Sequence, residues 1–163
     1  MPSEFTVDIK CDFVIPDFMD ATVPLTQISE VVANDCRKNI RKSTDFETGS
    51  PLAKLARKTI NDKKRLGYGG KPPLERTGVM LNAIHAYKVV NNVAVIGIIS
   101  RGSPRRDMIG IYHQYLGVNK QTRVIRRFLG ISPERWEKIK SRMDRWVAER
   151  LQKSSHKYLN LKV

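Results

Sequence analysis

The chain has 163 residues, with 30 Lys and Arg against 16 Asp and Glu, so its formal net charge is +14 and its isoelectric point is near 10.1. Hydrophobic residues make up 40% of the chain, which is enough for the core of one domain and argues against complete disorder. No stretch is long and apolar enough for a membrane-spanning helix. Two cysteines and three scattered histidines exclude a disulfide framework and a zinc ribbon. The excess of basic residues requires a polyanionic or acidic partner.

The first 36 residues are near-neutral to acidic, and they begin with a pattern that alternates apolar and polar residues. The apolar members are Phe5, Val7, Ile9 and Cys11. This alternation predicts a short strand or extended arm. Glu4 and Asp8 stand where a secretory peptide would have its apolar core, so we expect none. Pro16 and Pro24 bracket a connection, and we predict an N-terminal arm over residues 1–24.

A helix is predicted from Leu25, where the apolar spacing changes to steps of three and four residues. Its apolar face is formed by Leu25, Ile28, Val32, Cys36 and Ile40. Because Cys36 belongs to this face, we interpret it as a core thiol rather than a nucleophile. The helix opens a single predicted domain over residues 25–155, followed by a C-terminal tail over residues 156–163.

The middle of the chain predicts two more helices separated by a glycine-rich loop. Ser50-Pro51 has the form of an N-cap followed by proline, so a helix is expected to restart there. Its expected inner face is Leu52, Leu55, Ala56 and Ile60. Residues 67–73 lack the Lys-Ser/Thr ending of a phosphate-binding loop, which favours a mobile or partner-contacting loop. Thr77 is expected to cap a short helix that runs through Ile84.

A β-hairpin is predicted next, from Ala86–Val90 and Val93–Ile99 joined by Asn91-Asn92. The second run is apolar at nearly every position, as in a strand that is buried on both faces or lies in an assembly interface. The polar segment that follows, with Arg101, Arg105 and Arg106, is expected at the surface.

The last predicted element is a long, basic C-terminal helix that opens at Ser132-Pro133-Glu134. Its apolar stripe consists of Trp136, Ile139, Met143, Trp146, Val147 and Leu151. Together the elements predict an α+β domain, in which three to four helices pack on a small antiparallel sheet and the C-terminal helix is long.

The sequence contains no constellation that indicates catalysis, a metal site or a cofactor. His113 stands beside Gln114 without an accompanying serine or cysteine motif. We therefore expect these two side chains to anchor a turn beside the sheet through hydrogen bonds to backbone groups. Aromatic residues among basic ones leave nucleic-acid binding open, although no recognised RNA-binding motif is present.

Several short motifs occur in an order that carries more information than any of them alone. They are Phe46-Glu47-Thr48-Gly49, Leu52-Ala53, Leu55-Ala56-Arg57-Lys58-Thr59, Pro73-Leu74-Glu75-Arg76-Thr77-Gly78-Val79-Met80, Ile111-Tyr112-His113-Gln114-Tyr115-Leu116-Gly117 and Arg126-Arg127-Phe128-Leu129-Gly130-Ile131-Ser132. Over residues 25–150 their order resembles the phage virion morphogenesis, or tail completion, family and the related small tail-component, head–tail connector proteins of long-tailed phages. Arg127 stands where that family has proline.

The resemblance implies a structural, non-enzymatic virion protein that forms a ring at the head–tail junction (the neck) or at the top of the tail. It would act in tail completion or head–tail joining. Six or twelve copies are implied, with neck, portal or tail-tube and terminator proteins as neighbours. Genomic DNA could pass through the channel, and assembly would take place in the host cytoplasm without a membrane. The alternative function is a basic nucleic-acid-binding regulatory or ribosome-associated protein.

Three sets of residues follow from this reading. The candidates for partner or DNA contact, for which a solvated surface is the alternative, are Arg101, Arg105, Arg106, Arg126 and Arg127. The motif residues expected to be structural are Phe46, Thr77, Gly78, His113, Gln114, Gly117, Phe128 and Leu129. The residues expected in the core are Phe46, Leu74, Ile84, Phe128 and Leu129.

Overall fold

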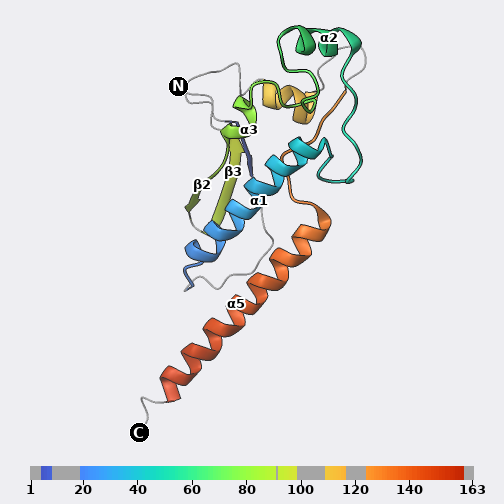
Figure 1. Cartoon of the computed structure of the whole chain (residues 1–163). Coiled ribbons are helices and arrows are strands. Elements are labelled where there is room, and N and C mark those ends of the chain that lie inside the picture. The colour runs from blue at the N-terminus through green and yellow to red at the C-terminus, as the bar shows by residue number, and fades with distance from the viewer. Residues whose placement is uncertain (1–4, 9–18, 91, 99–108, 117–123, 160–163) are drawn as a thin grey trace.

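The computed structural model describes residues 5–8, 19–90, 92–98, 109–116 and 124–159 (Figure 1). The elements follow in the order β1 (Phe5–Asp8), α1 (Thr22–Lys42), α2 (Arg57–Arg65), α3 (Val79–Ala83), β2 (Ile84–Val90), β3 (Val93–Ile98), the π-helical turn η1 (Tyr112–Leu116) and α5 (Pro133–Leu159). Helices and one small antiparallel sheet thus form an α+β fold with a long C-terminal helix, as predicted.

The sheet has three strands in the order β1-β3-β2, so the apolar strand β3 lies in the middle. β1, which comes from the expected N-terminal arm, pairs antiparallel with β3 from Phe5 opposite Ile98. β2 and β3 form the predicted hairpin, with a bulge in β2 before Val89. Asn92 takes the positive φ of 59° that the turn requires. Its side chain also accepts a hydrogen bond from the backbone N–H of Ala21 at 3.1 Å, which joins the hairpin to the start of α1.

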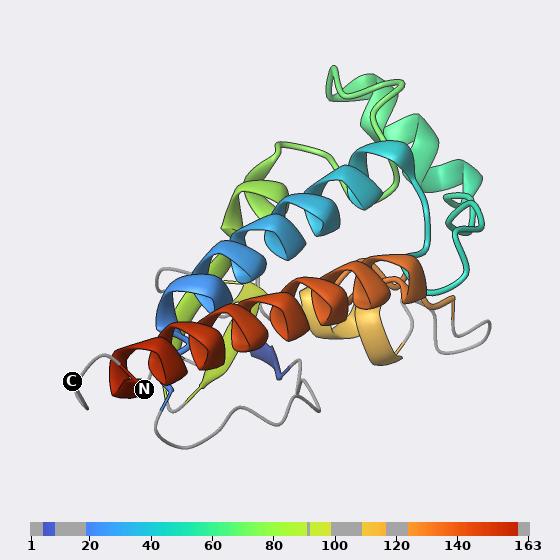
Figure 2. The same cartoon turned by 90° about the horizontal axis from the view of Figure 1, so that it is seen from below.

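Helix α1 lies against the sheet and contacts both β2 and β3 (Figures 1 and 2). It begins at Thr22, three residues before the predicted start. Its predicted apolar face is confirmed, because all five members are buried: Leu25, Ile28, Val32, Cys36 and Ile40. Burial of this face against the sheet builds the main core of the protein.

The prediction that a helix restarts at Ser50-Pro51 is wrong, since α2 begins only at Arg57. The backbone N–H of Leu52 donates to the carbonyl of Ser43 at 2.6 Å, and that of Asp45 donates to the carbonyl of Ser50 at 2.8 Å. These bonds pair residues 50–52 as extended chain with residues 43–45, which follow α1. This pairing outweighs the local capping signal of Ser50-Pro51. Consequently Ile60 is 39% exposed and does not lie in an inner face.

The short helix after the glycine-rich loop also differs from the prediction. Gly78, at a φ of 78°, is the N-cap of α3, and no side chain, that of Thr77 included, caps this helix. A φ of this sign suits glycine because it has no Cβ. The helix ends at Ala83, since Ile84 is already the first residue of β2.

The core contains four of the five residues expected there: Leu74, Ile84, Phe128 and Leu129 are buried. The expectation for Phe46 is wrong in degree, because its side chain is only half-buried. In α5, whose first turn is capped by the Ser132 hydroxyl at 3.2 Å from the N–H of Arg135, Met143 is buried but Leu151 is 47% exposed. The predicted stripe therefore packs on the core as far as Trp146 and is exposed at Leu151. The last turns of α5 extend past the sheet (Figure 1).

Candidate functional site

The residues expected to contact a partner fall into two groups. Arg101, Arg105 and Arg106, like the motif residue Gly117, lie outside the described residues. Arg126 and Arg127 are described, and their side chains have different surroundings although they are neighbours in the chain. Their tertiary contacts therefore separate two residues that look equivalent in the sequence.

Arg126 is only 4% exposed, so the expectation that it contacts a partner from the surface is wrong for this chain. Its Nε donates to the carbonyl of Ala53 and its Nη2 to the carbonyl of Lys54, both at 3.0 Å. Its backbone N–H donates to the carbonyl of His113 at 2.7 Å. Arg126 thus joins three separate stretches of chain, and burial lowers the pKa of its guanidinium.

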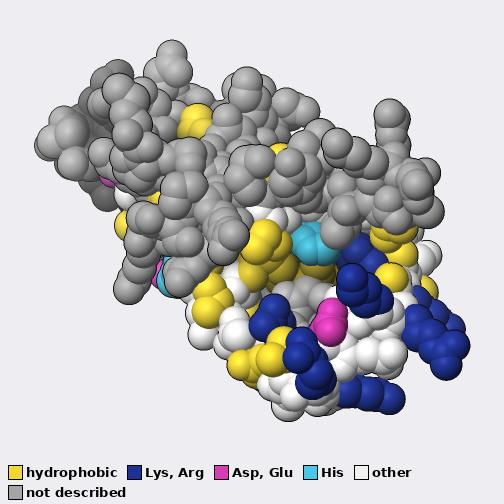
Figure 3. Space-filling model, turned by 90° about the horizontal axis from the view of Figure 1, so that it is seen from above, with side chains coloured by type: hydrophobic (Ala, Val, Ile, Leu, Met, Phe, Trp, Pro, Cys, Tyr) yellow, Lys and Arg dark blue, Asp and Glu magenta, His cyan; other side chains and the backbone are white. Residues whose placement is uncertain are grey.

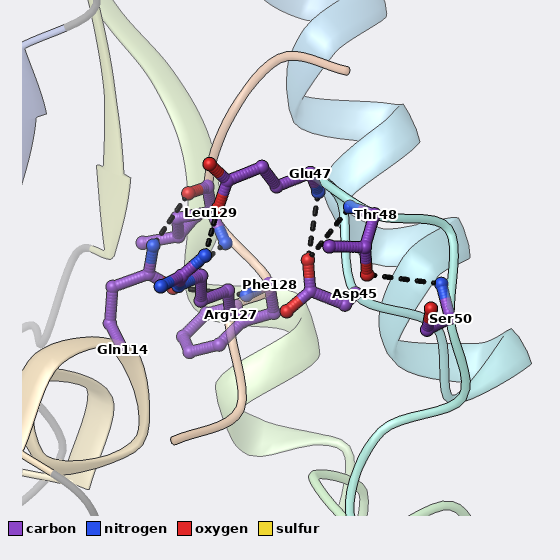
Figure 4. Close-up of polar contacts among 8 residues, drawn as sticks. All are labelled: Asp45, Glu47, Thr48, Ser50, Gln114, Arg127, Phe128 and Leu129. Atoms are coloured by element: carbon purple, nitrogen blue, oxygen red, sulfur yellow. Dashed lines mark hydrogen bonds and ion pairs between the residues drawn. The ribbon is translucent and has the colours of Figure 1, made fainter. Parts of the chain in front are cut away.

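Arg127 is half exposed and forms an ion pair with the carboxylate of Glu47 (Figure 4). Glu47 is presented by a tight turn in which the Asp45 carboxylate accepts the N–H groups of Glu47 at 2.9 Å and Thr48 at 3.2 Å. The Phe46-Glu47-Thr48-Gly49 motif is therefore a turn that meets the Arg126–Ser132 motif, far away in the sequence.

Gln114 has the backbone-anchoring role that the sequence predicted. Its side-chain oxygen accepts the N–H groups of Phe128 at 2.9 Å and Leu129 at 3.1 Å, and its nitrogen donates to the carbonyl of Leu129 at 2.7 Å (Figure 4). All three bonds are buried, so they satisfy backbone groups that water cannot reach. Gln114 thereby fixes the position at which Phe128 enters the core.

Gly130 lies where the turn motif and α1 meet the segment before α5. A Cβ added to Gly130 would lie 2.2 Å from the ring of Phe46, so glycine is required for this close approach. The Cys36 thiol donates to the carbonyl of Gly130 at 3.6 Å, and burial raises its pKa to about 11. Cys36 is therefore a protonated core thiol, as predicted, and not a nucleophile.

The expectation that the side chain of His113 hydrogen-bonds to backbone is wrong for its Nδ1 atom. This atom is buried and has no hydrogen-bond partner in the described part of the chain. Burial, and then the positive charge of Arg126, lower the pKa of His113 to about 4. The imidazole is therefore neutral at pH 7.

His113 also borders an apolar hollow of about 390 Å³ between the 73–80 motif and the start of the η1 segment. Thr77 and Gly78 line it, and so do Val79 and Ile109, which are 38% and 48% exposed. In the view onto this end of the molecule, exposed hydrophobic side chains gather beside a histidine (Figure 3). The motif residues Thr77, Gly78 and His113 thus share one concave surface.

A second candidate surface was not recognised from the sequence. Residues 54–76, which we call the α2 lobe, lie beyond the C-terminal end of α1 and away from the sheet (Figures 1 and 2). Within it, the buried Nζ of Lys63 donates to the carbonyls of Lys71, Pro72 and Glu75 at 2.9, 2.8 and 2.8 Å. Nothing in the sequence distinguishes Lys63 from the exposed Lys64 beside it.

No protein-family model, curated protein or solved structure matches the chain. Among the residues that the structure describes, no group of His, Cys, Asp and Glu is arranged to hold a metal ion. Of the helices in those same ranges, none combines the length and apolarity needed to cross a membrane.

Proposed function

We propose that this chain is a structural virion protein of a tailed phage, which forms a homo-oligomeric ring at the head–tail junction or the top of the tail. One observation supports the proposal most directly. Three of the motifs that resemble the tail completion family are far apart in the sequence, yet they contact one another around Phe128–Gly130. Gln114 approaches it from η1, whereas Phe46 and Glu47 approach it from the turn after α1. The motifs therefore act as one structural unit, as a shared fold requires.

An apolar contact between copies would favour a ring, since each subunit carries a net charge of +14 and like charges repel. The hollow supplies one, because Val79 and Ile109 are exposed there among apolar lining residues. We assign this surface to the neighbouring copy. Replacing both residues by aspartate should leave the fold intact but prevent ring formation.

Two measurements test the proposal. Mass spectrometry and electron microscopy of purified virions should find the chain at the neck, and native mass spectrometry should find a closed assembly. The Val79→Asp/Ile109→Asp variant should then be monomeric, whereas the control Lys140→Asp/Lys153→Asp, on exposed positions of α5, should assemble. The absence of the chain from virions would refute the proposed location.

The alternative is a basic regulatory or ribosome-associated protein that binds nucleic acid as a free monomer or dimer. The charge of the α2 lobe is the observation that favours it. A gene neighbourhood without capsid, portal and tail genes would support this alternative, and a neighbourhood rich in them would argue against it.

A further inference from the structure

We propose that the α2 lobe binds the phosphate backbone of duplex DNA without reading its base sequence. The inference depends on the lobe's charges and hydrogen bonds, not on the proposed ring. It would hold for a virion protein beside a DNA channel and for a free protein alike.

The first argument is the concentration of charge in the lobe. Residues 54–76 contain eight basic and two acidic residues, a net charge of +6. Residues 133–153 of α5, a stretch of similar length, contain seven basic and four acidic residues, a net charge of +3. The lobe therefore carries twice the net charge of this stretch of α5. Lys and Arg side chains also gather in the view onto this end (Figure 3).

The second argument is that the charges are exposed and mostly without acidic partners. The exposed basic residues of the lobe are Lys54, Arg57, Lys58, Lys64, Arg65, Lys71 and Arg76. Only two of them have an acidic partner within the described residues: Arg65 is 3.8 Å from Asp62, and Lys71 is 3.6 Å from Glu75. Ion pairs this open contribute little to stability, so the positive charges remain free to attract phosphate groups.

The third argument is that the lobe is held in shape before any partner binds. Lys63 joins the end of α2 to the loop carbonyls of residues 71–75. Arg126 holds the carbonyls of residues 53–54 at the start of the lobe. A surface ordered in advance loses less conformational entropy on binding. Two buried cations are thus used to position seven exposed ones.

The composition of the lobe favours duplex DNA over an acidic protein or a single strand. Lysine is depleted from protein–protein interfaces, whereas protein–DNA interfaces are strongly basic. Single-strand binding relies on exposed aromatic rings that stack on bases. The only aromatic residue of the lobe, Tyr68, is half-buried, with Lys71 at 5.8 Å and Arg76 at 5.7 Å from its ring centre. This ring is therefore occupied by the lobe's own cations.

The test is fluorescence anisotropy of the full-length protein with short DNA duplexes of two unrelated sequences, titrated between about 50 and 200 mM salt. The lobe variant is Arg57→Gln/Lys58→Gln/Lys64→Gln, and the control with the same charge loss is Lys140→Gln/Arg145→Gln/Lys153→Gln. We expect equal affinity for both sequences. The affinity of the lobe variant for DNA should fall about tenfold or more, and the magnitude of its slope of log affinity against log salt should fall by about 2 to 3. The affinity of the control should fall less than about threefold.

Two further variants separate the charge of the lobe from its shape. Arg57→Lys/Lys58→Arg/Lys64→Arg keeps the charge and should retain binding. Lys63→Met removes one buried charge and should still weaken binding severalfold, because the loop loses its three hydrogen bonds. Equal losses in the lobe variant and the α5 control, or undiminished binding by the lobe variant, would overturn the proposal. Neither result bears on whether virions contain the chain, which the experiment on purified virions decides.

Discussion

Different forces stabilise the α2 lobe and the part of the protein built on α1 and the sheet, which we call the body. In the body, α1 and the sheet bury a continuous apolar core that includes Phe128 and Ile98, each 0% exposed. From the lobe only Leu74 reaches that core, and Ile60 and Leu66 are 39% and 42% exposed. Besides its backbone hydrogen bonds, the lobe is held by the charged side chains of Lys63 and Arg126, which donate to its backbone carbonyls. From this comparison we expect the lobe to open without unfolding of the body.

This difference has an energetic basis. Burial of apolar side chains is non-directional and cooperative, so removing one of them weakens the whole core. A buried cation bonded to carbonyls acts on the few residues that it joins, and the cost of removing it from water offsets much of its gain. The body should therefore determine global stability, and the lobe should show local opening at lower free energy.

The largest expected effect is that of Phe128→Ala in the body. Phe128 is completely buried, and truncation to alanine should reduce the free energy of unfolding by about 4 kcal/mol. Urea denaturation measures this change. The matched variant in the lobe, Ile60→Ala, should change it by less than about 0.5 kcal/mol because Ile60 is already partly in water. Similar losses in the two variants would contradict the division into two regions.

The next effect is a loss of stability in acid that depends on His113, at the boundary between the regions. Its pKa is about 4 in the folded protein, against an ordinary value of 6.5, so the unfolded chain binds the proton more readily. The contribution of the neutral His113 to the free energy of unfolding is fully present above about pH 6.5. It should be lost, by up to about 3 kcal/mol, as the pH drops to about 4. Denaturation at several pH values should show this dependence in the wild type and in His85→Gln. It should be largely absent in His113→Phe.

A smaller effect is expected where the turn motif packs on the body. Gly130→Ala places a methyl group on the ring of Phe46, and the displacement of that ring should cost about 2 kcal/mol. In a Phe46→Leu background the same substitution should cost less, since the clashing atoms are gone. A double-mutant cycle by thermal unfolding measures the difference. Strictly additive costs would show that the contact is not the cause.

A still smaller effect on global stability is expected for the buried lysine of the lobe. Lys63→Met should lower the free energy of unfolding by only about 1 kcal/mol, because water can reach the freed carbonyls once the loop opens. Amide hydrogen exchange should nevertheless become faster throughout residues 64–76 while α1 and β3 keep their protection. Lys64→Met, an exposed neighbour, serves as the control and should change neither quantity. Faster exchange throughout the body as well would show that the lobe and the body unfold together.

The elements that the sequence predicted well are those whose apolar residues repeat with a regular period. The face of α1, the β2–β3 hairpin with Asn92 in its turn and the start of α5 at Ser132 all have local causes. The start of α2 was predicted wrongly because Leu52 pairs with Ser43. A long-range backbone pairing of this kind has no local signal.

The roles of individual polar residues show the same division. The sequence determined the fold class, the anchoring role of Gln114 and the core position of Cys36, since a polar residue inside an apolar pattern must be satisfied there. It also determined that the chain is strongly basic. Only the tertiary structure decided that Lys63 and Arg126 are buried while Lys64 and Arg127 are not. The reason is physical: side chains of the same type are equivalent in a sequence, and they differ only in which backbone carbonyls the fold brings within their reach.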